Sequence, residues 1–354
     1  MSDTLRFLVR RVVAGLLTVL AMVTVTFVIF WATPTQPARF VYPSVQTLTA
    51  WHIQHGDHIL RIDRPKTDQY LDYVTHLFRW DFGDSWARGF ALPGESAGSK
   101  GFPITAQLDA QLRVTLSLLL GGAAVVLLLS VPLGAFAGSR VGTLSDRTVS
   151  LVALIGVCSH PMVLGILVRS LFHGRLHWTP PGGYCPLSNG RPGCDGPADW
   201  ATHLALPWLT FALLFLALYV RMIRVSVAET LPQDFVRTAR AKGASNLRVM
   251  TRHVLPNAGL RVLTMIGMEI GTALGVCIYV EAAFGLPGLA SRAVFAMSGS
   301  TNLDLPVIMA LVFVISTIVV VGNFAVDTLY AVLDPRLALG GRPRTGKSAA
   351  GGVI

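Results

Sequence analysis

Residues 341–348, near the end of the chain, read GRPRTGKS and fit the nucleotide-binding pattern G-x-x-x-x-G-K-[ST]. In a P-loop, a strand presents this loop and the following helix points its N-terminus at the phosphates. No strand pattern precedes the motif here, and only six residues follow Ser348. We therefore interpret the match as coincidence, and we do not expect ATP hydrolysis by this chain.

A second cluster, WHIQHGDHIL, places His52, His55, Asp57 and His58 close together in sequence. Imidazole and carboxylate groups are ligands for transition metals. However, Gly56 is expected to break any helix that would align His52 with His55. A solvated polar turn is therefore favoured over a metal site, and we predict no metal ligands.

Glu269 is a carboxylate within an apolar run, where it costs roughly 3 kcal/mol or more in a bilayer unless it is partnered or hydrated. Gly267, Gly271 and Gly275 recur every fourth residue and predict a smooth face for close helix packing. Glu269 lies about 200° around the helix from Gly267, at about 100° per residue, and so points away from that face. It could line a translocation pathway and meet an amino-bearing solute. The alternatives are a structural partner on a neighbouring helix, or a neutral, protonated acid.

The chain has four cysteines. Cys158 and Cys277 lie within apolar runs, where a buried thiol is ordinary packing. Cys185 and Cys194 share the Pro- and Gly-rich stretch YCPLSNGRPGCDG, which is predicted to be an extracytoplasmic loop. An oxidising exterior favours a disulfide between them, and two free thiols are the alternative.

These residues belong to a chain that is 52% hydrophobic and only 14% charged, against roughly 25% charged in soluble domains. Only helices or closed barrels satisfy the backbone in lipid, and the apolar runs do not alternate as barrel strands do. We therefore predict an all-α membrane protein with six transmembrane helices, the first retained rather than cleaved as a signal peptide. The six windows are 12–31, 114–139, 148–168, 203–220, 262–280 and 305–326.

The distribution of Lys and Arg predicts the orientation. With the N-terminus inside, the cytoplasmic segments hold 17 of these residues, whereas the two short outside loops hold only a few, including Arg175, Arg191 and Arg292. Both termini are therefore expected in the cytoplasm. The net charge of +10 is then mainly an orientation signal, so membrane lipid and no nucleic acid is expected as a partner.

Three regions follow from this topology. Residues 1–32 hold the N-terminal segment and first helix, residues 33–107 form an extracytoplasmic segment with a few short helices, and residues 108–354 form the core. The core includes a cytoplasmic loop at 226–258 and a cytoplasmic tail at 336–354.

Within the cytoplasmic loop, residues 229–243 are predicted to form a helix that Thr230 and Gln233 cap and Gly243 ends. Ser245 is expected to start a second helix. Leu247, Met250 and Val254 are expected to form an apolar stripe along this second helix. Pro256 is expected to end it. Small side chains in this loop would let another protein approach closely; they are Thr238, Ala239, Ala241, Gly243 and Ala244. Three cationic side chains, Arg237, Arg240 and Lys242, could pair with acidic groups on that protein.

This loop resembles the coupling loop of bacterial ATP-binding-cassette (ABC) importer permeases, which reads EAA, three residues, Gly, nine residues, Ile-x-Leu-Pro. Arg237-Thr238-Ala239 stands at EAA, with Gly243 at the glycine, His253 at the isoleucine and Leu255-Pro256 at the end. The spacing matches, whereas the first, second and isoleucine positions depart. Arg-Thr-Ala followed by RAKG resembles the dipeptide and oligopeptide branch. The resemblance assigns ATPase coupling to Asp234, Arg237, Thr238, Ala239, Arg240, Lys242, Gly243, His253, Leu255 and Pro256.

Further segments in the same order resemble that branch and extend the similarity over nearly the whole chain: RIDRP, WDFGDSW, PITAQLDAQLRVTLSL, VPLGAFAG, LHWTPPGGY, HLALPWLTFAL, FGLPGL and VDTLYAVLDPR. The resemblance implies the type I ABC importer permease fold in the bacterial inner membrane. It also implies a second homologous permease, two ATPase subunits and an extracytoplasmic binding protein. This chain would hold no cofactor, because ATP and Mg²⁺ belong to the ATPases.

Peptides are the substrate class that this resemblance implies. A permease for nickel chelates or another small solute is the alternative within the same architecture. A membrane-bound enzyme would need a convergent catalytic set, and a membrane ATPase would rest on the tail motif alone. We therefore expect a transport subunit rather than an enzyme.

Overall fold

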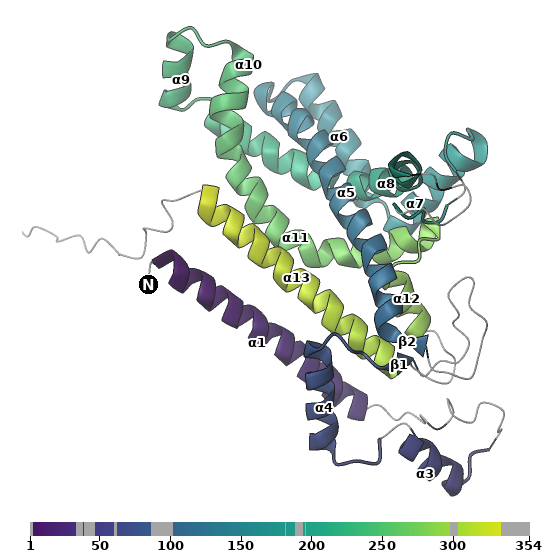
Figure 1. Cartoon of the computed structure of the whole chain (residues 1–354). Helices are drawn as coiled ribbons and strands as arrows, with labels where there is room; N and C mark the ends of the chain where they lie inside the picture. The colour runs from purple at the N-terminus through teal and green to yellow at the C-terminus, as the bar shows by residue number, and fades with distance from the viewer. Residues whose placement is uncertain are drawn as a thin grey trace, which may run out of the picture.

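The computed structural model describes residues 3–32, 38, 47–59, 62–85, 102–180, 182–187, 194, 196–297 and 304–333. In this part of the chain the fold is helical apart from one two-stranded sheet (Figure 1). The tail motif at 341–348 lies outside the described residues.

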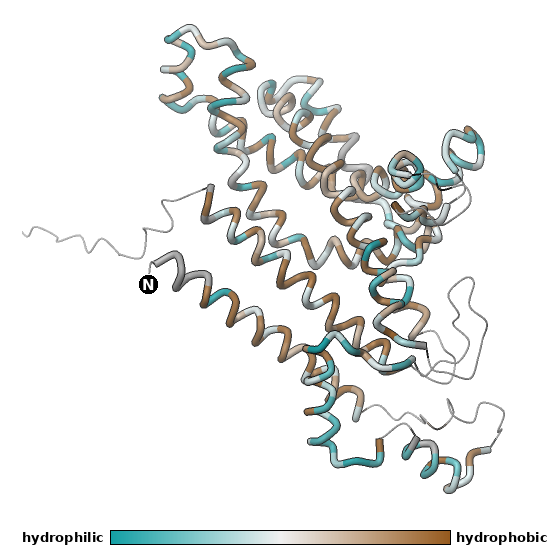
Figure 2. The backbone as a smooth tube through the Cα atoms, in the orientation of Figure 1, coloured by the Kyte–Doolittle hydropathy of each residue, from teal (hydrophilic) through white to brown (hydrophobic). Residues whose placement is uncertain are grey.

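Five long helices form the frame: α1 (Asp3–Ala32), α5 (Ile104–Ser139), α8 (Pro197–Thr230), α11 (Leu255–Phe284) and α13 (Leu305–Leu333). Each is long and apolar enough to cross a membrane. Figure 2 shows hydrophobic residues along these helices and hydrophilic residues gathered toward the two ends of the molecule. The described part of the chain is therefore that of a predominantly helical membrane protein, with five continuous candidate spans.

The third predicted span is not one helix, so that expectation is wrong for residues 148–168. The structure divides this region into α6 (Leu144–Cys158), α7 (Pro161–Arg169) and a π-helix (Ser170–Arg175). His160, between α6 and α7, has an extended backbone at φ −66° and ψ 131°. Proline disfavours the helical conformation of the residue before it, which accounts for the break at His160.

Helices α5 and α8 pack with close approach of their backbones. A Cβ at Gly134 would lie 2.7 Å from the Cβ of Ile223, and one at Gly138 would lie 2.7 Å from the carbonyl oxygen of Arg224. Small residues allow such contact between membrane helices, where van der Waals packing drives association. This pair supports the main buried cluster, which continues into α11.

Helix α1 packs antiparallel to α13. Arg11 near the start of α1 donates to the Asp327 carboxylate at 3.0 Å, and Gly15 lies against Val320. The start of α1 and the end of α13 therefore lie together, toward the end of the molecule that carries α9 (Asp234–Ala241) in Figure 1.

The opposite end carries α3 (Ala50–Ile59), α4 (Lys66–Phe78), α12 (Leu289–Met297) and the small sheet. Strands β1 (Asp84–Ser85) and β2 (Phe102–Pro103) pair antiparallel. Ser85 donates to the Asp304 carboxylate at 2.5 Å, and Arg292 lies 3.8 Å from the same carboxylate. This buried group ties the sheet to α12 and to the start of α13.

Helix α3 runs through Gly56, so the expected break in the histidine cluster is wrong. A single glycine in a helix costs only about 1 kcal/mol, which neighbouring structure can offset. His52 bonds to Thr49 through Nδ1 at 2.6 Å, and His58 bonds to Asp63 at 2.7 Å. His55 stacks on Trp51 with ring centroids 5.0 Å apart. Among the described residues, no group of three or more His, Cys, Asp or Glu is arranged to hold a metal ion.

Candidate functional site

The cytoplasmic loop predicted from the sequence projects from the helical bundle as α9 and α10 (Asn246–Val249). Helix α8 continues to Thr230, and α9 begins only at Asp234. The predicted single helix over 229–243 is therefore wrong in its first turn. The predicted cap is also wrong, because Thr230 lies inside α8 and donates its hydroxyl to the Ser226 carbonyl at 2.7 Å. Gln233 is the N-cap residue of α9, but its side chain makes no cap hydrogen bond.

The end of α9 is a Schellman motif centred on Gly243. The Gly243 N–H donates to the Arg240 carbonyl at 2.9 Å, and the Ala244 N–H donates to the Ala239 carbonyl at 3.2 Å. Gly243 has φ +82°, a left-handed conformation that glycine adopts without a Cβ clash. The sequence prediction that Gly243 ends this helix is confirmed.

Ser245 starts the second helix as predicted, because its hydroxyl oxygen accepts the Arg248 N–H at 3.4 Å. The helix does not break at Pro256. It passes through a π-helix (Met250–Val254) into α11, with the proline in the first turn of α11. Leu247 is 74% exposed, while Val249 and Val254 are buried. The predicted apolar stripe is therefore correct only at Val254 and, in part, at Met250.

Helix α9 and the turn after it expose their cationic side chains, while some apolar side chains of α9 are buried. Val236 and Ala239 are buried against the rest of the core, whereas Arg237, Arg240 and Lys242 are exposed. The remaining predicted coupling residues divide between the outer face and the junction with α11. Asp234, Thr238, Gly243 and Pro256 are exposed, and His253 and Leu255 are partly buried.

Two ion pairs hold the base of this loop. Glu229 near the end of α8 pairs with Arg261 near the start of α11. Asp146 at the start of α6 makes a two-point contact with Arg224 of α8, at 2.5 Å to Nε and 2.6 Å to Nη2. Asp146 also accepts the Gly142 N–H at 2.9 Å. These bonds lower the pKa of Asp146 to about 2, the Arg224 hydrogen bond being the largest cause.

Sequence reasoning missed this Asp146–Arg224 clamp. Only the opposite charges of Asp146 and Arg224 were visible in the sequence, and 78 positions separate them. The clamp connects the turn after α5 to the segment of α8 that leads into the loop.

A cavity of about 500 Å³ lies between four of the candidate spans, α5, α8, α11 and α13. Its wall is almost entirely apolar, and Glu269 of α11 lines it together with Tyr219 and Thr317. The structure thus places Glu269 away from solvent-facing loops and among the long helices.

Among the described residues, the glycine face of α11 packs closely at one of its three glycines. A Cβ at Gly267 would lie 3.1 Å from Val326 of α13, whereas one at Gly271 or Gly275 would meet nothing within 4 Å. The predicted close packing is therefore present at Gly267 and absent at Gly271 and Gly275 among the described residues.

A second carboxylate, Glu281, is fully buried near the end of α11. It accepts the Thr115 hydroxyl at 2.7 Å and the Ser291 N–H at 2.9 Å, and Thr115 in turn accepts the Leu289 N–H. A Cβ at Gly288 would overlap this carboxylate. Glu281 therefore joins α5 and α11 to the N-terminus of α12, where a negative charge is favourable. Sequence analysis assigned it no role.

Two family models match the chain. Residues 130–339 match the binding-protein-dependent transport system inner membrane component, and residues 4–88 match the N-terminal region of such membrane components. The first match spans more than half of the chain. The chain belongs to this permease family.

Relatives match along most of this permease. A candidate peptide permease of Brucella ovis is 33% identical over 94% of this chain and 99% of its own length. The oligopeptide transport system permease protein AppB of Bacillus subtilis is 30% identical over 94% of this chain and 98% of its own length.

A solved structure shows a similar fold. The inward-facing MetNI methionine ABC transporter aligns with a TM-score of 0.52 at 16% identity, covering 66% of this permease and 100% of that chain. Membership of the binding-protein-dependent transport family makes the permease a transport subunit of the inner membrane rather than an enzyme, and implies an ATPase and a binding protein as partners.

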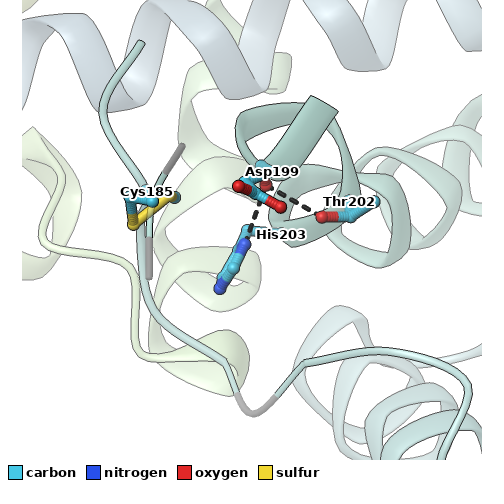
Figure 3. The surroundings of a disulfide bond; sticks show 5 residues. Cys185, Asp199, Thr202 and His203 are labelled. Atoms are coloured by element: carbon cyan, nitrogen blue, oxygen red, sulfur yellow. Dashed lines mark hydrogen bonds between the residues drawn. A yellow bond between two sulfur atoms is a disulfide. The ribbon is translucent and has the colours of Figure 1, made fainter. Parts of the chain in front are cut away.

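The permease carries a disulfide on the loop between α7 and α8. The structure joins Cys185 to Cys194, with their Cα atoms 5.6 Å apart. Figure 3 shows Cys185 beside the first turns of α8, where the Asp199 carbonyl accepts from Thr202 at 2.9 Å and from His203 at 2.8 Å. Nearby, the Gly183 N–H donates to the Phe284 carbonyl at 3.0 Å. The loop thus contacts the end of α11.

We expect Cys185 and Cys194 to resist thiol labelling in membranes until a reductant is added. Closing this loop should restrict the unfolded chain by about 2–3 kcal/mol on the chain-entropy model. Mass spectrometry of maleimide-labelled protein measures the result, and Cys185→Ser is the control that should expose Cys194. Labelling of both cysteines in the wild type without reductant would contradict the pairing.

Proposed function

We propose that this chain is a permease subunit of an importer that moves dipeptides or oligopeptides from a binding protein into the cytoplasm. The observation that carries the proposal is the similarity to the oligopeptide permease AppB along 94% of the chain. The RTARAKG segment, folded into α9 and ended by Gly243, supports the same assignment.

In the proposed topology, α6 and α7 cross the membrane together as a broken third span. This gives six crossings and places both termini in the cytoplasm. The pairing of Arg11 with Asp327 supports the proposal, because it holds the start of α1 beside the end of α13. The excess of Lys and Arg in the loops on that side also supports it.

A second, homologous permease is the proposed partner within the membrane. Gly271 and Gly275 of α11 leave an open strip with exposed Met268 beside it. Small residues of this kind allow another membrane helix to approach closely. We propose that the second permease covers this strip.

ATPase subunits are proposed to dock on α9 and α10. Arg237, Arg240 and Lys242 supply charge for acidic groups on the ATPase, and the small residues Thr238 and Gly243 permit close contact. Because Glu229 and Asp146 tie the base of the loop to α11 and α6, a displacement of the loop would be transmitted to the membrane helices.

Purification of this chain with coexpressed candidate ATPase, permease and binding-protein partners, followed by uptake into proteoliposomes, tests this function. We expect the ATPases to copurify with this chain and labelled di- to pentapeptides to accumulate only with ATP and the binding protein. A Lys347→Ala control should transport normally, because the tail motif is not expected to bind nucleotide. Uptake of a nickel chelate without peptide uptake would overturn the substrate class. Nucleotide binding by this chain purified alone that is lost in Lys347→Ala would revive an ATPase role for it.

A further inference from the structure

The cavity between α5, α8, α11 and α13 has a chemical character of its own. Its wall consists mainly of Leu, Val, Ile, Ala and Phe side chains. Glu269 is the only carboxylate among the residues that line it, and none of them is cationic. The cavity thus combines a large apolar surface with one negative group.

Among the residues that the structure describes, Glu269 has no hydrogen-bond or ion-pair partner. The carboxylates of Glu281 and Asp327 differ, since Glu281 binds Thr115 and Ser291 while Asp327 binds Arg11. An ionised carboxylate at this depth is costly unless a cation, a donor or water meets it. Glu269 is therefore a membrane carboxylate that has no partner within the described part of this chain.

We infer that this cavity receives the free amino terminus of a short peptide with apolar side chains. The inference rests on the proposed peptide import and specifies which peptides pass. An ammonium group supplies the missing opposite charge and up to three donors for the Glu269 oxygens. The apolar walls favour Leu- or Phe-like side chains, and about 500 Å³ falls within the roughly 300–1,000 Å³ of small-ligand sites.

This site makes a chemical distinction that the apolar wall alone would not make. An N-acetylated peptide keeps its side chains but has no ammonium group, so it leaves Glu269 unpartnered. A peptide that carries an acidic residue next to its amino terminus places like charges together. Both should bind less well than an apolar peptide with a free amine.

A thiol-protection experiment on the assembled transporter tests the inference. Val321 lines the cavity and is 58% exposed, so Val321→Cys supplies a reporter thiol, while the native Cys277 is buried. Labelling by a water-soluble maleimide is followed at position 321 with leucyl-phenylalanine or its N-acetyl derivative as protectant. We expect the free-amine peptide to protect at a concentration about tenfold lower than the acetylated one.

Glu269→Gln, made in the Val321→Cys protein, should remove this difference while retaining protection by both peptides. Asp327→Asn is the matched control, because it removes a carboxylate of a spanning helix outside the cavity. It should leave the tenfold difference intact. Equal protection by the two peptides before any change at Glu269 would overturn the inference.

The size of the cavity is tested separately with Ala325→Phe. Ala325 is an exposed residue of the lining, so the added ring narrows the space. Protection by leucyl-phenylalanine should weaken more than protection by glycyl-glycine.

Other outcomes identify other occupants. No labelling of Val321→Cys in the complex would mean that the second permease covers the cavity. Labelling only by a lipid-partitioning maleimide would mean that lipid fills it, and either result would overturn the inference. Because protection is read without ATP or transport, absence of peptide uptake by the wild-type complex would count against the proposed function instead.

Discussion

Gly243→Trp is expected to reduce ATP-driven uptake by more than about tenfold, a difference of about 1.4 kcal/mol in coupling, while the complex still inserts in the membrane. Gly243 has φ +82°, so a bulky side chain such as that of Trp strains this turn by about 1–3 kcal/mol. Apart from its chain neighbours, no atom of the described residues lies within 4 Å of a Cβ built there, so the indole ring would have room to extend outward. It would occupy the space where an ATPase is proposed to dock.

Gly243→Asn is the matched control for this prediction. Asparagine tolerates the left-handed conformation and is small, so the Schellman motif should persist and most uptake should remain. ATP hydrolysis and peptide uptake are measured in the same proteoliposomes. Arg237→Glu with Arg240→Glu should also uncouple uptake from hydrolysis, because the exposed cations would become acids. Wild-type uptake by Gly243→Trp would count strongly against coupling through this loop.

Asp146→Asn is expected to destabilise the purified permease by about 1–3 kcal/mol, because it removes charge-assisted bonds to Arg224 and leaves that guanidinium without its carboxylate. The Asp146 side chain is only 3% exposed, so water cannot replace the lost bonds readily. Asp72→Asn is the control, since the Arg64–Asp72 pair is exposed on both sides and should contribute about 0–1 kcal/mol. Thermal unfolding in detergent measures both, and equal melting temperatures for Asp146→Asn and the wild type would contradict the clamp.

The same clamp predicts a pH dependence. The pKa of Asp146 is lowered from 3.8 to about 2 in the folded protein, so the folded state favours the ionised form. The stabilisation is complete above about pH 4 and is lost as the pH falls toward 2. The difference in melting temperature between wild type and Asp146→Asn should therefore stay constant from pH 7 to pH 5 and shrink below pH 4.

The sequence alone predicted the class of this protein because its signals are local. Apolar runs long enough for a bilayer and the uneven Lys and Arg content depend only on composition along the chain. The end of α9 at Gly243 and the start of α10 at Ser245 were also predictable, because a left-handed turn and an N-cap each involve only a few neighbouring residues. The order of short motifs around RTARAKG indicated the permease family, which the family match confirms.

Tertiary structure decided the features that depend on residues far apart in the chain. The contacts of Asp146 with Arg224 and of Glu281 with Thr115 join positions 78 and 166 residues apart, so no local pattern indicates them. The loop continues through a π-helix into α11 rather than ending at Pro256, and Pro161 divided a run whose hydropathy alone suggested one helix. Helical periodicity could show that Glu269 points away from the glycine face. Only the packing of α5, α8 and α13 around α11 shows that it meets an apolar cavity, because one helix carries no information about its neighbours.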